Sequence, residues 1–161
     1  MLKFYPATTF DADALLLRGV RAADQAECWK MAGVTVDELL RESVEKSVCA
    51  ATAEYDGNPI ALFGVAPLPL FPLLSNKTMG LVWLIAHEDL SRPELAATLA
   101  RASREFIACW LRGYELLGNF VDPENAVSLR WLAWLGFTID AQNPVYGPHG
   151  HKLYRFWKRR A

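Results

Sequence analysis

The sequence predicts an α/β (α+β) fold in which helices flank a mixed, largely antiparallel sheet. Two patterns support this prediction: short β-prone segments alternate with segments whose apolar residues recur about every 3.6 positions. The expected element order is β-α-α-β-β-β-α-β-α-β-β. At 161 residues, with no internal repeat and no linker, the chain fits one domain spanning residues 1–161.

The first third of the chain predicts one strand and two helices. Residues 2–5 form a short strand, and a helix capped by Thr9 or Asp11 follows it through Val20. A second helix begins after Thr35, because the carboxylates of Asp37 and Glu38 in its first turn interact favourably with the positive end of a helix dipole.

The middle of the chain predicts a hairpin followed by a buried strand. Residues 48–55 and 59–66 are β-prone, and residues 56–58 (Asp-Gly-Asn) form a turn in which glycine accepts a positive φ. Residues 79–87 are almost all apolar, which is typical of a strand covered on both faces.

The longest predicted helix lies over residues 95–111, where apolar side chains recur at helical spacing and most charged ones fall outside that stripe. Gly113 ends this helix, and residues 116–121 form the next strand.

The C-terminal part predicts a short helix and two more strands. The helix starts at Asp122, with proline at its first position, and ends at Gly136. Strands over 137–140 and 152–158 then flank a turn-rich segment, residues 143–150.

The composition excludes several classes of protein. With 52% hydrophobic and 22% charged residues, the chain does not have the composition of a disordered protein. Its net charge of −1 argues against a nucleic acid as its partner. The three cysteines fit reduced thiols inside a cell. The uncharged stretch between Asp56 and Lys77 is interrupted by prolines, so we expect no membrane span and no secretion.

One apolar segment suggests an interface. The Pro67–Leu74 segment (PLPLFPLL) carries no polar side chain, so we expect it to fold back on the domain or to form a contact between copies or with a partner. His149 and His151 lie close together in a turn, but no cysteine or carboxylate near them completes a metal site. The sequence therefore predicts no metal.

Two segments resemble motifs of the Gcn5-related N-acetyltransferase (GNAT) family. Residues 125–137 (NAVSLRWLAWLGF) resemble the penultimate helix of that family, in which an asparagine precedes Gly-Phe by eleven positions. Residues 81–96 (LVWLIAHEDLSRPELA) resemble its central strand and the start of its long helix. The resemblance implies a GNAT fold and transfer of an acetyl group from acetyl-CoA to an amine.

The C-terminal third also resembles a small internal virion protein of T7-like short-tailed phages. Residues 114–139 carry an aromatic strand and a basic-aromatic helix face, and residues 152–158 complete the resemblance. It implies a phage-encoded protein located in the host cytoplasm or the virion, with a phage particle or a host protein as its partner.

The GNAT resemblance locates a site for the pyrophosphate of acetyl-CoA at the start of the long helix. The family positions fall on Ser91, Glu94 and Ala96, with Arg92 between them and Asn125 on the later helix. Glu94 replaces a glycine that lets backbone N–H groups approach the phosphates, which argues against ordinary cofactor binding. Residues 91–94 alternatively predict a capping box, with Ser91 and Glu94 as its two members.

The resemblance also requires a general acid and a base. The family places a tyrosine where this chain has Leu132, which has no proton to give. His87 is a possible base at the end of the central strand, although such a histidine is often only hydrogen-bonded. Other residues that could take one of the two roles are Glu54, Glu88, Asp89, Tyr114, Tyr146 and Tyr154.

Two functions remain open at this point. Because Glu94 and Leu132 depart from the family pattern, the sequence favours a catalytically degenerate GNAT-fold protein that acts as a virion, assembly or interaction module. The alternative is an active acyl-CoA-dependent N-acetyltransferase with an atypical pyrophosphate loop. Positioning contributes much of the rate of acyl transfer, so the absence of an acid does not exclude it.

Overall fold

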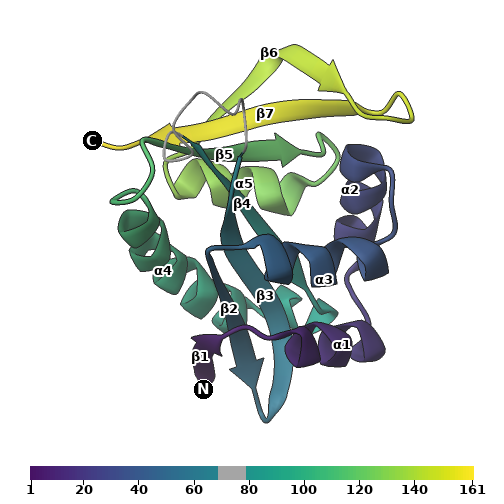
Figure 1. The fold of residues 1–161 in the computed structure, drawn as a ribbon, viewed down its shortest axis with the longest axis vertical. Coiled ribbons are helices and arrows are strands. Elements are labelled where there is room, and N and C mark those ends of the chain that lie inside the picture. Colours follow the sequence, from purple (N-terminus) through teal and green to yellow (C-terminus); the bar gives the residue numbers. More distant parts are fainter. Residues whose placement is uncertain (69–78) are drawn as a thin grey trace.

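A seven-stranded sheet forms the centre of the computed structural model, which describes residues 1–68 and 79–161 (Figure 1). The strands are β1 (Leu2–Pro6), β2 (Cys49–Tyr55), β3 (Asn58–Pro67), β4 (Met79–Ala86), β5 (Leu116–Val121), β6 (Thr138–Tyr146) and β7 (Lys152–Arg159). The helices are α1 (Thr9–Arg18), α2 (Ala22–Ala32), α3 (Val36–Lys46), the 3₁₀ helix η1 (Glu88–Ser91), α4 (Pro93–Trp110) and α5 (Ala126–Trp134).

The strand order is β1-β2-β3-β4-β5-β7-β6, and only β4 and β5 run parallel among these neighbours. This confirms the predicted mixed, largely antiparallel sheet. The parallel pairing consists of three residue pairs and ends at Leu81 opposite Gly118. Beyond this point the two strands separate, and we call the space between them the splay. At its start, Asn119 Nδ2 donates to the carbonyl oxygen of Val82 at 2.9 Å.

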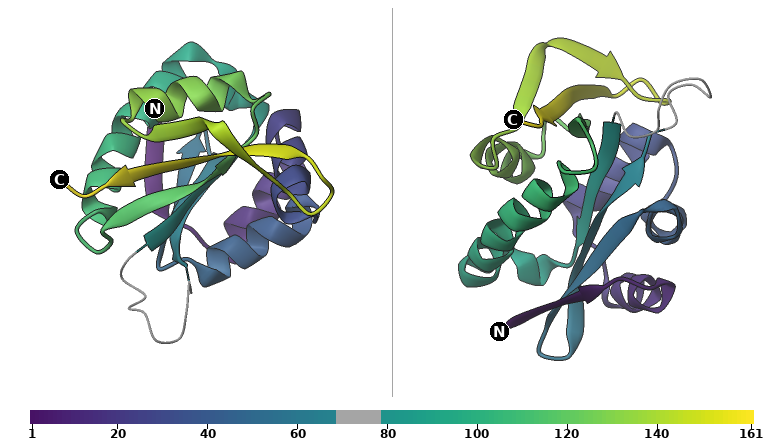
Figure 2. Two further views of the ribbon diagram at one scale, coloured as in Figure 1. Left: turned by 90° about the horizontal axis from the view of Figure 1, so that it is seen from above. Right: turned by 60° about the vertical axis from the view of Figure 1, so that its left-hand side comes forward.

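Helices cover both faces of the sheet. Helices α1, α2 and α3 lie on one face, and α4 and α5 lie on the other (Figure 2). Two clusters of buried side chains correspond to these layers. Phe63 and Leu99 belong to the cluster under α4, and Leu15, Leu40 and Leu62 belong to the cluster under α1 and α3.

Several local predictions are confirmed. The turn between β2 and β3 has positive φ at Asp56 (52°) and Gly57 (78°), as expected for a tight hairpin. Helix α3 begins directly after Thr35, and α4 occupies the segment in which apolar residues recur at helical spacing. No helix in residues 1–68 and 79–161 is long and apolar enough to cross a membrane. Most of the Pro67–Leu74 segment lies outside the described residues.

The number of helices before β2 was predicted wrongly, because the sequence indicated two and the structure has three. The missing one is α2, which buries only Asp24 and Cys28 and so shows no apolar repeat. The cap of α1 also differs. Thr8 is the N-cap, and Asp11 is the N3 member of a capping box rather than the cap itself.

Two boundaries near the C-terminus differ as well. Helix α5 begins after Asn125 instead of at Asp122, because the Asp122 carboxylate accepts the backbone N–H of Glu124 and forms a turn first. Strand β6 continues to Tyr146, into the segment predicted as turns. A register shift after Asp140, whose carboxylate accepts nearby backbone N–H groups, allows the strand to resume.

Candidate active site

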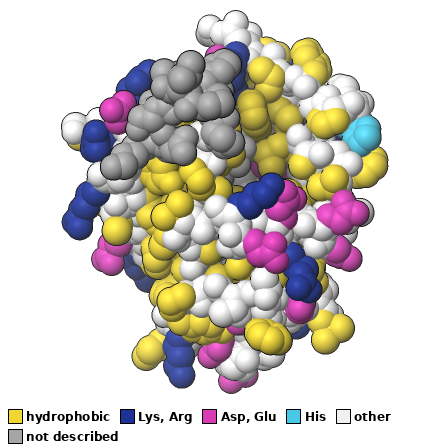
Figure 3. Space-filling view, in the orientation of Figure 1, with side chains coloured by type: hydrophobic (Ala, Val, Ile, Leu, Met, Phe, Trp, Pro, Cys, Tyr) yellow, Lys and Arg dark blue, Asp and Glu magenta, His cyan; other side chains and the backbone are white. Residues whose placement is uncertain are grey.

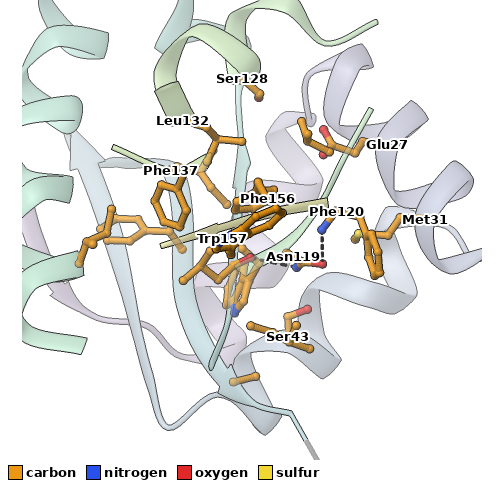
Figure 4. Close-up of a pocket in the computed structure, with 18 of the residues that line it drawn as sticks. Glu27, Met31, Ser43, Asn119, Phe120, Ser128, Leu132, Phe137, Phe156 and Trp157 are labelled. Atoms are coloured by element: carbon orange, nitrogen blue, oxygen red, sulfur yellow. Dashed lines mark hydrogen bonds between the residues drawn. The ribbon is translucent and has the colours of Figure 1, made fainter. Parts of the chain in front are cut away.

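A cavity of about 1030 Å³ occupies the splay. Side chains of α2 and α3 line it from one face of the sheet, and side chains of α4 and α5 line it from the other. In Figure 4, Glu27, Met31 and Phe120 lie on one side of the cavity, and Leu132 and Phe137 lie on the other. Hydrophobic side chains reach the surface in the middle of the face shown in Figure 3, beside acidic and basic ones. The cavity therefore has walls from both helical layers of the protein.

Helix α2 spans the open end of the splay. At the end of β4, Asp24 Oδ2 accepts the backbone N–H of Ala86 at 2.8 Å, and Arg21 pairs with the same carboxylate at 2.9 Å. After the end of β5, Asp122 Oδ2 accepts a hydrogen bond from Lys30 Nζ at 2.9 Å. The two strands that separate are thus joined again, through side chains, by α2.

Glu27 lies between these two contacts and lines the cavity. Its Oε2 accepts a hydrogen bond from Asn125 Nδ2 at 2.8 Å. Burial raises the pKa of Glu27 to about 7, and the Asp24 carboxylate adds to that rise, while the Asn125 hydrogen bond opposes it. A carboxyl group with this pKa can accept or release a proton near neutral pH, which is a requirement for general acid–base catalysis.

Sequence reasoning missed Glu27 because it missed α2. One signal could have found it: Asp24, Glu27 and Lys30 are spaced by three residues, so on a helix they share a face. A polar face of this kind does not by itself indicate a buried helix. The residues that contact this polar face lie far away in the sequence, as Asn125 lies far from Glu27.

The predicted capping box at the start of α4 is wrong. Ser91 belongs to η1, and its Oγ donates to the carbonyl oxygen of Glu88 at 2.7 Å. The N-cap of α4 is Arg92, because Pro93 takes the first helical position, and no side chain in the described residues caps this end. The Glu94 carboxylate instead accepts a hydrogen bond from Arg92 Nε at 2.8 Å.

The first turn of α4 nevertheless satisfies its own donors. Pro93 has no N–H, and the N–H groups of Leu95 and Ala96 bond to the carbonyl oxygen of Arg92 at 3.1 and 3.0 Å. The backbone N–H of Glu94 and then Arg92 hold the pKa of the Glu94 carboxyl below its usual value. These positions fit a pyrophosphate only through Arg92, whose guanidinium is exposed.

His87 is not among the described residues that line the cavity. Its Nδ1 accepts the backbone N–H of Asp89 at 3.0 Å, so the imidazole caps η1. Arg18 pairs with Asp89 at 2.9 Å and holds the pKa of that carboxyl below its usual value. Glu54 is also not among the residues that line the cavity, and it accepts a hydrogen bond from the Tyr5 hydroxyl at 3.0 Å. The role of His87 as a base stays a prediction.

Asn125 holds two elements together. Its Oδ1 accepts the backbone N–H of Ser128 at 3.3 Å and caps α5, while its Nδ2 reaches Glu27 on α2. The side chain is buried, and its Oδ1 and its Nδ2 each have a partner within the protein. Leu132 lines the cavity from α5, and the described lining includes none of Tyr114, Tyr146 and Tyr154.

The loop between β6 and β7 packs against the outer side of α2. His149 stacks on Trp29 with ring centroids 4.2 Å apart. Gly147 approaches the backbone of α2 so closely that a Cβ at this position would overlap the carbonyl oxygen of Lys30. Within the part of the chain that the structure describes, no group of histidine, cysteine and carboxylate side chains could hold a metal ion.

The chain matches solved structures of acetyltransferases over almost its whole length. The N-acetyltransferase of Staphylococcus aureus Mu50 is 13% identical, with a TM-score of 0.70 over 100% of this chain and 99% of that one. A GNAT-family acetyltransferase of Streptococcus pneumoniae is 12% identical, with a TM-score of 0.63 and complete coverage of both chains. This chain has the GNAT fold. No protein-family model and no curated protein sequence matches it.

A further GNAT-fold neighbour is known with a ligand. The yncA protein of Salmonella typhimurium, whose structure contains its cofactor acetyl-CoA, is 15% identical, with a TM-score of 0.66 over 100% of this chain and 95% of that one. At such identities the likeness concerns the fold, and the GNAT fold by itself does not decide what this chain does. The chemistry therefore has to be argued from its own residues.

Proposed function

We propose that this protein transfers an acyl group from an acyl-CoA to an amine. The observation that carries the proposal is the cavity in the splay, which is lined from both faces of the sheet. A transfer reaction needs two substrates held in contact at one point, and holding them in the right geometry supplies much of the rate enhancement. A cavity lined from both faces of the sheet suits that requirement.

The acyl donor fits the side of the cavity formed by α4 and α5. Leu132 and Phe137 give this side an apolar lining for the acyl group and its thioester. Arg92 at the start of α4, which is not among the residues that line the cavity, would offer a cation to the pyrophosphate. It is paired with Glu94, but such exposed ion pairs are weak, so a phosphate can compete for the guanidinium.

The absence of a tyrosine at Leu132 does not prevent the reaction. A thiolate is a good leaving group and can take its proton from water, so a protein acid lowers the barrier but is not obligatory. The acetyl-CoA bound to the yncA protein supports an acyl-CoA donor for a fold of this kind.

A second candidate function is a non-catalytic one. Glu94 and Leu132 stand where the resembling family has a glycine and a tyrosine, and the first turn of α4 satisfies its own donors. These observations favour a GNAT-fold protein that serves as a virion, assembly or interaction module in a phage particle or its host. In that case the cavity would take no acyl-CoA.

Titration of acetyl-CoA into the purified protein tests the two candidates. We expect binding by calorimetry, a rise in the melting temperature, and release of CoA when amines are added. A ligand at 100 times its Kd stabilises the folded state by about 2.7 kcal/mol, which a thermal scan detects easily. The absence of any binding at millimolar acetyl-CoA would overturn the enzyme proposal and leave the interaction module.

A further inference from the structure

We propose that the α2 side of the cavity receives a primary amine carried on an apolar body, and that Glu27 takes the proton that this amine must lose. The inference rests on the proposed function for the transfer step, and it names the class of acceptor. It follows from two properties of this side of the cavity, its charge and its apolar surface.

The charge points to a single cation. Among the described carboxylates that line the cavity, Asp24 is paired with Arg21 and Glu42 with Lys46. Asp140 accepts backbone N–H groups of the β6 bulge.

Glu27 and Asp140 have no cation partner among the described residues, and each is hydrogen-bonded by a neutral amide, Asn125 at 2.8 Å for Glu27 and Asn143 at 3.3 Å for Asp140. The hydrogen bonds of Asp140 are exposed to water, whereas that of Glu27 is partly buried. A carboxylate without a cation, partly removed from water, attracts an ammonium group. One such carboxylate suits one ammonium group rather than a polyamine.

The surface next to Glu27 is apolar. Met31 and Phe120 lie beside it (Figure 4), and Trp157 of β7 also lines the cavity. These three large side chains are only partly buried, so each presents apolar surface to the cavity. A ligand body of aromatic or aliphatic character would cover this surface and remove it from water. The acceptor is thus expected to be amphipathic, with one charged end and one apolar end.

The transfer balances with these groups alone. The ammonium gives one proton to Glu27 and becomes a neutral amine, whose lone pair forms the new C–N bond at the thioester carbonyl carbon. The C–S bond breaks and CoA leaves as a thiolate. The second proton lost by the nitrogen goes to this thiolate through water, and Glu27 returns its own proton to solvent.

The surroundings of Glu27 suit proton transfer at neutral pH. Asp24 faces it from the same helix, and Asp122, paired with Lys30, faces it from the end of β5. With a pKa of about 7, Glu27 is ionised in about half of the molecules at that pH. The rate should therefore rise with pH through this value.

The experiment compares three acceptors and three proteins. The acceptors are 2-phenylethylamine, ethanolamine and spermidine, with acetyl-CoA as donor and release of the CoA thiol as readout. The proteins are the wild-type chain, Glu27→Gln and, as a matched control, Glu45→Gln, which removes a carboxylate from an exposed position on α3. Binding of 2-phenylethylamine, and of its neutral analogue 2-phenylethanol, is measured separately by calorimetry.

We expect kcat/KM for 2-phenylethylamine to exceed that for the other two amines by at least about tenfold. Glu27→Gln should lower kcat by about 10² to 10⁴ and abolish the rise near pH 7, whereas Glu45→Gln should stay within about twofold of wild type. Glu27→Gln should also weaken 2-phenylethylamine binding and leave 2-phenylethanol binding unchanged.

The outcomes separate this inference from the proposed function. Preference for ethanolamine or spermidine, or full activity of Glu27→Gln, would overturn the inference while acyl transfer stands. No CoA release with any amine, combined with 2-phenylethylamine binding that depends on Glu27, would overturn acyl transfer while the amine site stands. Failure of wild type to bind 2-phenylethylamine would overturn the inference in either case.

Discussion

Helices α2 and α4 begin in the same way, with an arginine N-cap in an ion pair, but the two ion pairs differ in how deeply they are buried. Arg21 is the N-cap of α2 and Arg92 is the N-cap of α4, and each pairs with a carboxylate of its own first turn. In the Arg21–Asp24 pair the side chains are 12% and 5% exposed. In the Arg92–Glu94 pair they are 47% and 60% exposed.

Burial decides what each pair can do. Water and salt screen the exposed pair at α4, so it contributes little to stability and can be replaced by a ligand. The buried pair at α2 is screened much less, and Asp24 also holds the end of β4 through Ala86. The α4 end of the candidate site is therefore adaptable, and the α2 end is fixed.

Removal of the buried Asp24 carboxylate should have the largest effect on stability, and so it is the strongest test of the difference between the two ion pairs. Asp24→Ala leaves the Arg21 guanidinium buried without its partner and the N–H of Ala86 without its acceptor. We expect the free energy of unfolding to fall by about 3 to 5 kcal/mol in urea denaturation. Asp37→Ala, at an exposed position on α3, is the control. A loss below about 1 kcal/mol for Asp24→Ala would contradict the assigned difference.

Glu27 offers a second measurement at the α2 end. Its pKa rises from 4.5 to about 7 on folding, so the native state binds its proton more tightly than the unfolded state does. This contribution to stability is complete below about pH 4.5 and is lost as pH rises through 7.

Glu27→Gln should therefore be more stable than wild type at pH 8, by about 2 to 3 kcal/mol, and the difference should vanish near pH 4. Urea denaturation across this pH range, with Glu45→Gln alongside, gives the measurement. Equal stability of wild type and Glu27→Gln at pH 8 would show that folding does not raise the pKa of the Glu27 carboxyl.

The smallest expected effect lies at the α4 end. Glu94→Gln removes a carboxylate from the start of the helix and frees Arg92, so acetyl-CoA affinity should rise about two- to fivefold. Calorimetric titration measures this change, and Glu105→Gln, farther along the same helix, is the control. Unchanged or weaker binding would mean that Arg92 does not meet the pyrophosphate.

The contrast between the two ends also explains what the sequence could predict. The β2–β3 hairpin and α4 follow from turn residues and apolar periodicity that lie within a few positions of one another. The hydrogen bonds at the start of α4 were predicted wrongly, because Pro93 takes the first helical position and makes Arg92 the N-cap.

The α2 end depends on contacts that no local pattern contains. Asp24 is 62 residues from Ala86, Lys30 is 92 residues from Asp122, and Glu27 is 98 residues from Asn125. Only the topology of the sheet brings these residues together. For this reason the residue with the most suitable chemistry was the one that sequence reasoning did not find.

The short pairing of β4 with β5 has a consequence for the motion of the molecule. Strands β1 to β4 form one antiparallel unit, β5 to β7 form another, and three parallel residue pairs connect them. Opening along this seam breaks few strand hydrogen bonds, so it requires less free energy than unfolding either unit. We expect amide hydrogen exchange to be slow within β1–β4 and within β5–β7, and faster at the three residue pairs between β4 and β5. Because α2 is bonded to the ends of both β4 and β5, it limits how far the two units can separate.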